Sequence, residues 1–132
     1  MIKGKGRYIT FLYPSNWSWI NNPERQLPIL VASVSSPNHA SAIEIYHVTA
    51  QSPAEAMEYI QESLGQLGID VKYSATGQKN GMVEYSGTSY GSGGTFNWIG
   101  FFRSVSEGVE AVVIGSKGGM TPTLDQIINS VN

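Results

Sequence analysis

Cysteine is absent from the 132-residue chain, which excludes disulfides, thiolate nucleophiles and cysteine-ligated zinc or iron–sulfur sites. Charged residues are also scarce, at 14%, and the formal net charge at pH 7 is −2. Nucleic-acid binding depends on positive charge that neutralises phosphates, and no excess of it exists here. We therefore expect no nucleic-acid partner.

The sequence also has no long hydrophobic run, since none approaches the roughly 18 apolar residues that a membrane-spanning helix needs. Its first residues, MIKGKGRYITF, are basic but are not followed by the apolar region of a secretory signal. We expect no membrane span. Uncharged polar residues are expected to cover the surface, which is typical of bacterial proteins outside the cytoplasm and favours that location without fixing the compartment.

What the chain does have is enough apolar residues for one core. Hydrophobic residues make up 41% of the sequence and aromatic residues 11%. A chain of this length buries roughly two-thirds of its unfolded surface when it folds. No repeat, low-complexity tract or long linker divides it. We expect a single domain over residues 1–132.

Two segments carry the signals of amphipathic helices. The first follows Ser52 as N-cap and Pro53 at the first helical position, and it ends at Gly68, which can adopt a left-handed conformation. The second follows Thr121 and Pro122. Their apolar residues recur at helical spacing, namely Met57, Ile60, Leu64 and Leu67 in the first and Leu124, Ile127, Ile128 and Val131 in the second.

The remaining segments are rich in β-branched and aromatic residues and are separated by turn residues. Asn80-Gly81 predicts a type I′ hairpin turn, and Ser106-Glu107-Gly108 predicts another hairpin. The expected order is three strands, a helix, four strands and a helix. We predict an α+β fold, a mainly antiparallel sheet of six or seven strands with both helices packed on it in two layers. The clearest strand segments are residues 8–13, 29–35, 42–48, 95–104 and 109–115.

This order of elements resembles the PsbP-like family, which includes extrinsic proteins of photosystem II and DcrB-type bacterial lipoproteins. The local motif that carries the resemblance is YPSNW, in which Tyr13-Pro14 ends a strand and Trp17 follows. The resemblance implies an α+β domain that acts as an accessory or adaptor protein rather than as an enzyme. It transfers no functional residue to this chain.

A glycine-rich segment, GTSYGSGGTF, has the composition of a phosphate-binding loop. Such a loop needs glycines at fixed offsets between a strand and a helix N-terminus. Gly91, Gly93 and Gly94 lie instead between two predicted strands, and Phe96 stands where the third glycine is required. We interpret the segment as a hairpin loop and predict no cofactor.

The histidines, His39 and His47, are too few for a zinc site, which usually has three or four protein ligands. Glu44 lies on the opposite face of a regular strand from His47. We therefore predict no metal site and no catalytic residue. A hydrolase that pairs His39 or His47 with Glu44 or Glu84 stays open as an alternative, although no G-x-S-x-G motif is present.

The aromatic residues indicate where a partner could bind. Trp17 and Trp19 lie in residues 14–28, the longest segment expected to be irregular. Residues 95–104 are apolar on both faces, which predicts either a central strand or a partner-binding face. We predict a non-catalytic binding or adaptor domain for a protein or small ligand, with a homodimer as a further alternative. The expected binding surface comprises Trp17, Trp19, Tyr90, Gly91, Gly93 and Trp98.

Overall fold

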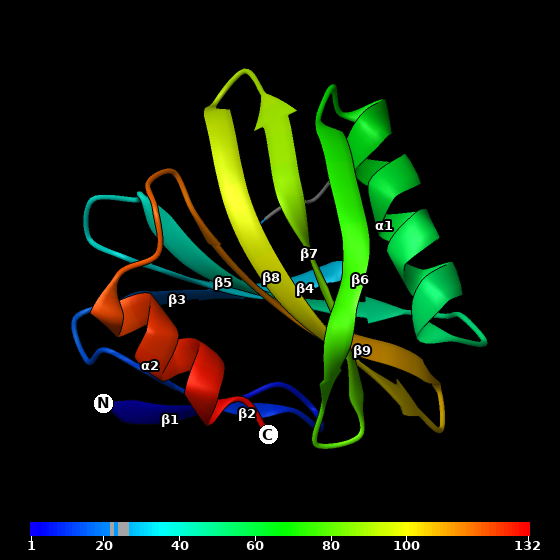
Figure 1. Cartoon of the computed structure of the whole chain (residues 1–132), viewed down its shortest axis with the longest axis horizontal. Helices are drawn as coiled ribbons and strands as arrows, with labels where there is room; N and C mark the ends of the chain where they lie inside the picture. The colour runs from blue at the N-terminus through cyan, green and yellow to red at the C-terminus, as the bar shows by residue number, and fades with distance from the viewer. Residues whose placement is uncertain (22, 24–26) are drawn as a thin grey trace.

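The structure, a computed structural model, describes residues 1–21, 23 and 27–132. These residues form nine strands and two helices (Figure 1). The elements are β1 (Ile2–Lys5), β2 (Thr10–Tyr13), β3 (Ser18–Asn21), β4 (Leu30–Ser35), β5 (Ser41–Val48), α1 (Pro53–Gln66), β6 (Asp70–Lys79), β7 (Met82–Gly91), β8 (Gly94–Val105), β9 (Gly108–Ser116) and α2 (Pro122–Ser130).

Seven strands form one antiparallel sheet in the order β3-β4-β5-β9-β8-β7-β6, while β1 and β2 pair separately. The sheet is strongly twisted, so that β6, β7 and β8 run steeply across β3, β4 and β5 in Figure 1. Strands β6 to β9 form three successive hairpins, in which β6 pairs with β7, β7 with β8 and β8 with β9. The predicted α+β class with a mainly antiparallel sheet is confirmed.

The hairpin turns follow the predicted chemistry. Asn80 and Gly81 have φ angles of 50° and 78°, as a type I′ turn requires. Gly91 pairs with Gly94, so the glycine-rich segment is the tip of the β7–β8 hairpin. No helix follows this tip, so the interpretation as a hairpin loop is confirmed.

Both helices begin where their caps predict. The Ser52 hydroxyl accepts a hydrogen bond from the Glu55 amide at 3.2 Å, and the Thr121 hydroxyl accepts one from the Leu124 amide at 3.2 Å. Helix α1 ends at Gln66, and Gly68 just beyond its cap residue Leu67 has the left-handed φ of +81°. Neither helix is long and apolar enough to cross a membrane, as far as the described residues go.

The helices lie on opposite faces of the sheet, so the domain has three layers rather than the two that we expected. Helix α1 packs against β5, β6 and β8, whereas α2 packs against β2 (Figure 1). The β1–β2 pair and α2 cover the second face together. A two-layer arrangement fails because β8 and β9 are apolar on both faces, and each face needs a cover.

Two apolar cores result. The α2-side core contains Phe11, Ile43, Phe101, Ile114 and Ile127, among others. The α1-side core contains Tyr46, Met57, Ile60, Trp98 and Phe102, among others. Strand β8 contributes to both cores, which confirms that it is a central strand covered on both sides.

Two segments differ from the sequence expectations. The basic N-terminal residues, which precede the first strand segment expected at residues 8–13, form β1, which pairs with β2 from Ile2 to Lys5. Within residues 14–28, expected to be irregular, β3 pairs with β4. These strands were missed because each is only four residues long and is defined by its partner. Residues 22 and 24–26 of that segment lie outside the described residues.

Candidate functional site: a cavity beneath helix α1

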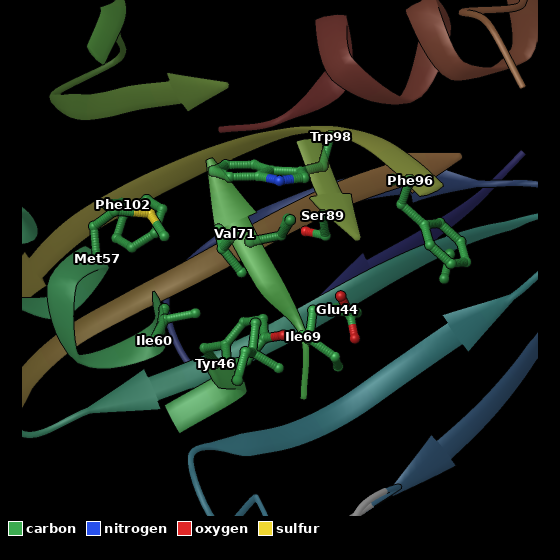
Figure 2. A pocket seen from close by; sticks show the side chains of 14 residues that line it. Glu44, Tyr46, Met57, Ile60, Ile69, Val71, Ser89, Phe96, Trp98 and Phe102 are labelled. Carbon is green, nitrogen blue, oxygen red and sulfur yellow. The ribbon is translucent and has the colours of Figure 1, made fainter. Parts of the chain in front are cut away.

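A cavity of about 210 Å³ lies between α1 and the sheet, within the α1-side core. Figure 2 shows Trp98 along one side, with Tyr46 and Ile60 opposite. The walls are mostly aliphatic and aromatic. The lining residues are Ala42, Glu44, Tyr46, Met57, Ile60, Leu64, Ile69, Val71, Ser89, Phe96, Trp98, Phe102, Val113 and Gly115.

The cavity exists because small residues meet on two neighbouring strands, β5 and β9, beside Trp98 on β8. Ala42 on β5 pairs with Gly115 on β9, and Gly115 pairs with Trp98 on β8. Neither Ala42 nor Gly115 has a side chain that reaches toward α1. The Trp98 ring therefore borders a part of the sheet that offers α1 no packing partner.

Helix α1 closes the cavity mainly through its first half. Met57 and Ile60 are buried, whereas Leu64 is only half-buried and Leu67 is 37% exposed. The helix therefore packs closely near its N-terminus and less closely near its C-terminus. The apolar lining of the cavity belongs partly to this looser end.

Glu44 is the one carboxylate among the described lining residues. Burial raises its pKa from 4.5 to about 6, and a hydrogen bond with Tyr46 offsets part of this effect. Burial, together with the negative charge of Glu44, raises the pKa of Tyr46 well above its ordinary value. Glu44 forms no ion pair with any residue that the structure describes. The cavity thus holds an acidic group that no described residue compensates with a positive charge.

Trp98 supplies a second polar group. Its side chain is 6% exposed, and its indole Nε1–H has no hydrogen-bond partner within the described part of the chain. Buried donors are usually paired, because an unpaired one costs about 1–3 kcal/mol. A cavity wall with this indole donor and with a carboxylate that forms no ion pair with the described residues can orient a polar group of a ligand.

The predicted binding residues are not brought together. Trp98 lines the cavity, and Gly91 lies near it, because a Cβ there would be 3.2 Å from Cγ1 of Ile69 in the lining. Tyr90 and Gly93 are exposed on the same β7–β8 hairpin. All four residues lie toward the tip of the hairpin that β7 and β8 form.

Trp17 and Trp19 lie elsewhere. Trp17 packs against the α2-side core, and Trp19 on β3 donates a hydrogen bond from Nε1 to the Tyr13 hydroxyl at 2.7 Å. Three strands, β4, β5 and β9, separate β3 from β8 in the sheet. The two halves of the expected binding surface are therefore separate, and Trp19 is engaged with Tyr13.

The histidines are also apart from Glu44. His47 lines a second cavity of about 340 Å³ on the opposite face, beside Glu110. Glu110 already accepts hydrogen bonds from the backbone amides of residues 7, 8 and 9 at 2.7, 2.9 and 2.7 Å. His39 occupies the β4–β5 turn with a φ of 58°. The opposite orientation of Glu44 and His47 agrees with the strand alternation.

Glu84, the other carboxylate considered for a hydrolase, accepts a hydrogen bond from the Thr76 hydroxyl at 2.6 Å. No hydrogen bond joins either histidine side chain to a carboxylate among the residues that the structure describes. Within the same residues, no group of three or more His, Asp or Glu side chains is arranged to hold a metal ion.

Sequence reasoning missed Ala42, Tyr46 and Gly115 as cavity residues. One signal was available, because Glu44 interrupts the otherwise apolar face that continues with Tyr46 and Val48. The pairing of Ala42 with Gly115 depends on strand register, which the sequence alone does not provide.

The chain was also compared with known proteins. No protein-family model and no curated protein matches it.

Proposed function

We propose that this chain is a non-catalytic binding domain that takes a small, largely apolar molecule into the cavity between α1 and the sheet. The observation that carries the proposal is the cavity itself. Native cores are close-packed, and voids larger than a water molecule are few. A space of about 210 Å³ bordered by Trp98, Phe96 and Phe102 is therefore a feature to be explained by what it holds.

The size of the cavity limits the ligand. An engineered cavity of about 150 Å³ in another protein binds benzene. The present volume of about 210 Å³ therefore suits one substituted ring or a short aliphatic chain. Ligand sites typically combine apolar walls with a few polar groups that orient the ligand. Glu44, Ser89 and the Trp98 indole supply such groups here.

A non-catalytic role also agrees with what the PsbP-like resemblance implies, and membership of that family stays a prediction. The proposal selects a small ligand over a protein partner. The reason is that Trp98 faces a cavity, while Trp19 is hydrogen-bonded to Tyr13 within the domain.

The test is a titration with toluene, followed through the Trp98 indole N–H signal in ¹H–¹⁵N NMR spectra. The variant Trp98→Phe assigns that signal among the three tryptophans. We expect a saturable shift of the Trp98 signal. The Trp17 and Trp19 signals serve as internal references and should stay in place.

The matched control is Ala42→Leu, which places a larger side chain on the floor of the cavity. It should keep a dispersed native spectrum and lose the saturable response to toluene. Absence of a response in the wild-type chain, or an equal response in Ala42→Leu, would contradict the proposal.

A further inference from the structure

We infer that the ligand of this cavity is an organic cation, a primary amine attached to one aromatic ring or a short apolar chain. The inference rests on the proposed function and names the ligand class for the same site. It follows from the charge of the lining, the chemistry of the walls and the surface next to the cavity.

Among the residues that the structure describes, the lining has a negative charge and no positive one. Glu44 and Tyr46 are the titratable groups of this described lining, which contains no Lys, Arg or His. An anionic ligand would place a second negative charge beside Glu44 in a poorly solvated space. Glu44 is half-buried, and a cation supplies the opposite charge that it does not receive from the described residues.

Lys117 is a cation close to the cavity, because its Nζ lies 5.6 Å from the centroid of the ring of Phe96, a lining residue. It is exposed and is not part of the lining. It is also not among the groups that shift the pKa of Glu44. Lys117 therefore leaves Glu44 free for the charge of a ligand.

The aromatic walls suit a cation as well as an apolar ring. Tyr46, Phe96, Trp98 and Phe102 all line the cavity. A cation over the face of an aromatic ring is attracted by the negative potential of that face, most strongly for tryptophan. An ammonium group near Glu44 can use this attraction while the apolar part of the same molecule fills the remaining space.

The neighbouring surface is acidic. Glu58 and Glu62 on α1 line a groove that shares Ile69 and Val71 with the cavity. Asp70 on β6 also lines this groove, but its carboxylate lies 3.6 Å from Lys72 Nζ. These carboxylates lie next to the proposed site without being part of it. Their negative potential favours the approach of cations and disfavours anions.

Three probes of similar shape but different charge test the inference: 2-phenylethylamine, 2-phenylethanol and 3-phenylpropanoate. Affinities are measured at pH 8, where Glu44 is ionised and the amine is protonated as a lysine side chain is. The amine should bind about tenfold or more tightly than the alcohol, because hydrogen bonds to charged groups contribute about 1.5–3 kcal/mol. The anion should bind most weakly.

Two variants locate the effect. Glu44→Gln keeps the shape of the side chain and removes its charge, so it should reduce the affinity for the amine to that for the alcohol. Its effect on the affinity for the alcohol should be much smaller than its effect on the affinity for the amine. Glu62→Gln, in the neighbouring groove, should change the affinity for the amine less than about twofold, since exposed charges are screened by water. A native NMR spectrum confirms that each variant is folded.

The possible failures are distinguishable. Equal binding of amine and alcohol, or an unchanged affinity of Glu44→Gln for the amine, would overturn the cation assignment while the small-ligand proposal stands. Failure of all three probes and of toluene to bind would overturn both.

Discussion

The two faces of the sheet are built from the same strands but differ in how closely they are packed. On the α2 side, β9 presents Val112 and Ile114, both fully buried. On the α1 side, the same strand presents Val113 and Gly115, which border a cavity. Around these residues the α2 side is thus closely packed (the closed face) and the α1 side borders a cavity (the hollow face). The second cavity, on the α2 side, lies nearer the start of β9, beside Glu110.

The covering elements differ in the same way. The chain end is fixed to the α2 side, because Thr10 and Asn132 exchange backbone hydrogen bonds of 2.8 and 2.9 Å. Helix α1 closes the other side mainly through Met57 and Ile60, while Leu67 stays partly exposed. The comparison shows close packing around Val112 and Ile114 on the α2 side, whereas the cavity of the proposed ligand lies on the α1 side.

The largest expected effect is on the closed face. Phe101 is fully buried in the α2-side core. Phe101→Ala should reduce the free energy of unfolding by about 3–5 kcal/mol, through lost apolar contact and a cavity that cannot collapse. Urea unfolding measures this loss. A reduction below about 2 kcal/mol would mean that the α2 side is less closely packed than described.

Glu110 gives the next effect. Its carboxylate, 2% exposed, accepts hydrogen bonds from the amides of Arg7, Tyr8 and Ile9, which connect β1 to β2. Glu110→Ala should reduce the free energy of unfolding by about 3 kcal/mol, because buried donors lose a charged partner. Hydrogen exchange of these three amides should become faster. Unchanged exchange rates would show that the carboxylate does not hold this connection.

On the hollow face, removing the charge of Glu44 should have the opposite effect at neutral pH, because it should raise the free energy of unfolding. Its folded-state pKa of about 6 exceeds the ordinary 4.5, so the folded state holds the proton more tightly than the unfolded state. Below pH 4.5 both states are protonated. As the pH rises through 6, the wild-type chain loses up to about 2 kcal/mol of stability, which corresponds to the difference in pKa.

Glu44→Gln removes this dependence because glutamine does not titrate. The variant should therefore be more stable than the wild-type chain at pH 8 by up to about 2 kcal/mol, and the difference should shrink toward zero below pH 4.5. Urea unfolding of both chains at a series of pH values measures the difference, in which the other titrating groups cancel. A difference that is independent of pH would contradict the burial of Glu44.

Local signals made the helices and hairpins predictable. Ser52, Gly68 and Asn80-Gly81 act on their own neighbours in the chain, and all three behave as predicted. Strand β3 was not predictable in this way, because its four residues are all exposed and carry no alternation. Its pairing with β4 is a tertiary contact.

The candidate site was predictable only in part. Trp98 was expected at a binding surface and lies in the cavity wall, which leaves its binding role a prediction. Trp19 was expected there too, but three other strands lie between its strand, β3, and β8. A cavity forms where side chains are missing on neighbouring strands. Finding it from sequence requires the register that places Ala42 beside Gly115.

The smallest expected effect is a difference in stability between alanine substitutions at two glycines, which lie on the α1 side of adjacent strands. At Gly115, an added Cβ would lie 3.6 Å from the Asn97 carbonyl oxygen and 3.6 Å from Trp98 Cβ, which are ordinary contacts. At Gly100, it would lie 3.1 Å from both Phe102 Cε1 and Val113 Cγ2, which must shift. Gly115→Ala should therefore be neutral or stabilising by up to about 1 kcal/mol, since alanine restricts the unfolded chain.

Gly100→Ala should instead destabilise the domain by about 1 kcal/mol or more, as overpacking does. The two variants differ by the same methyl group, so the comparison isolates the space around each site. Urea unfolding measures both, and the toluene titration adds a second readout. Gly115→Ala should weaken toluene binding without a loss of stability, because its methyl group occupies space that the fold does not need. If Gly115→Ala were as destabilising as Gly100→Ala, the two sites would be equally close-packed, and the cavity would not extend to Gly115.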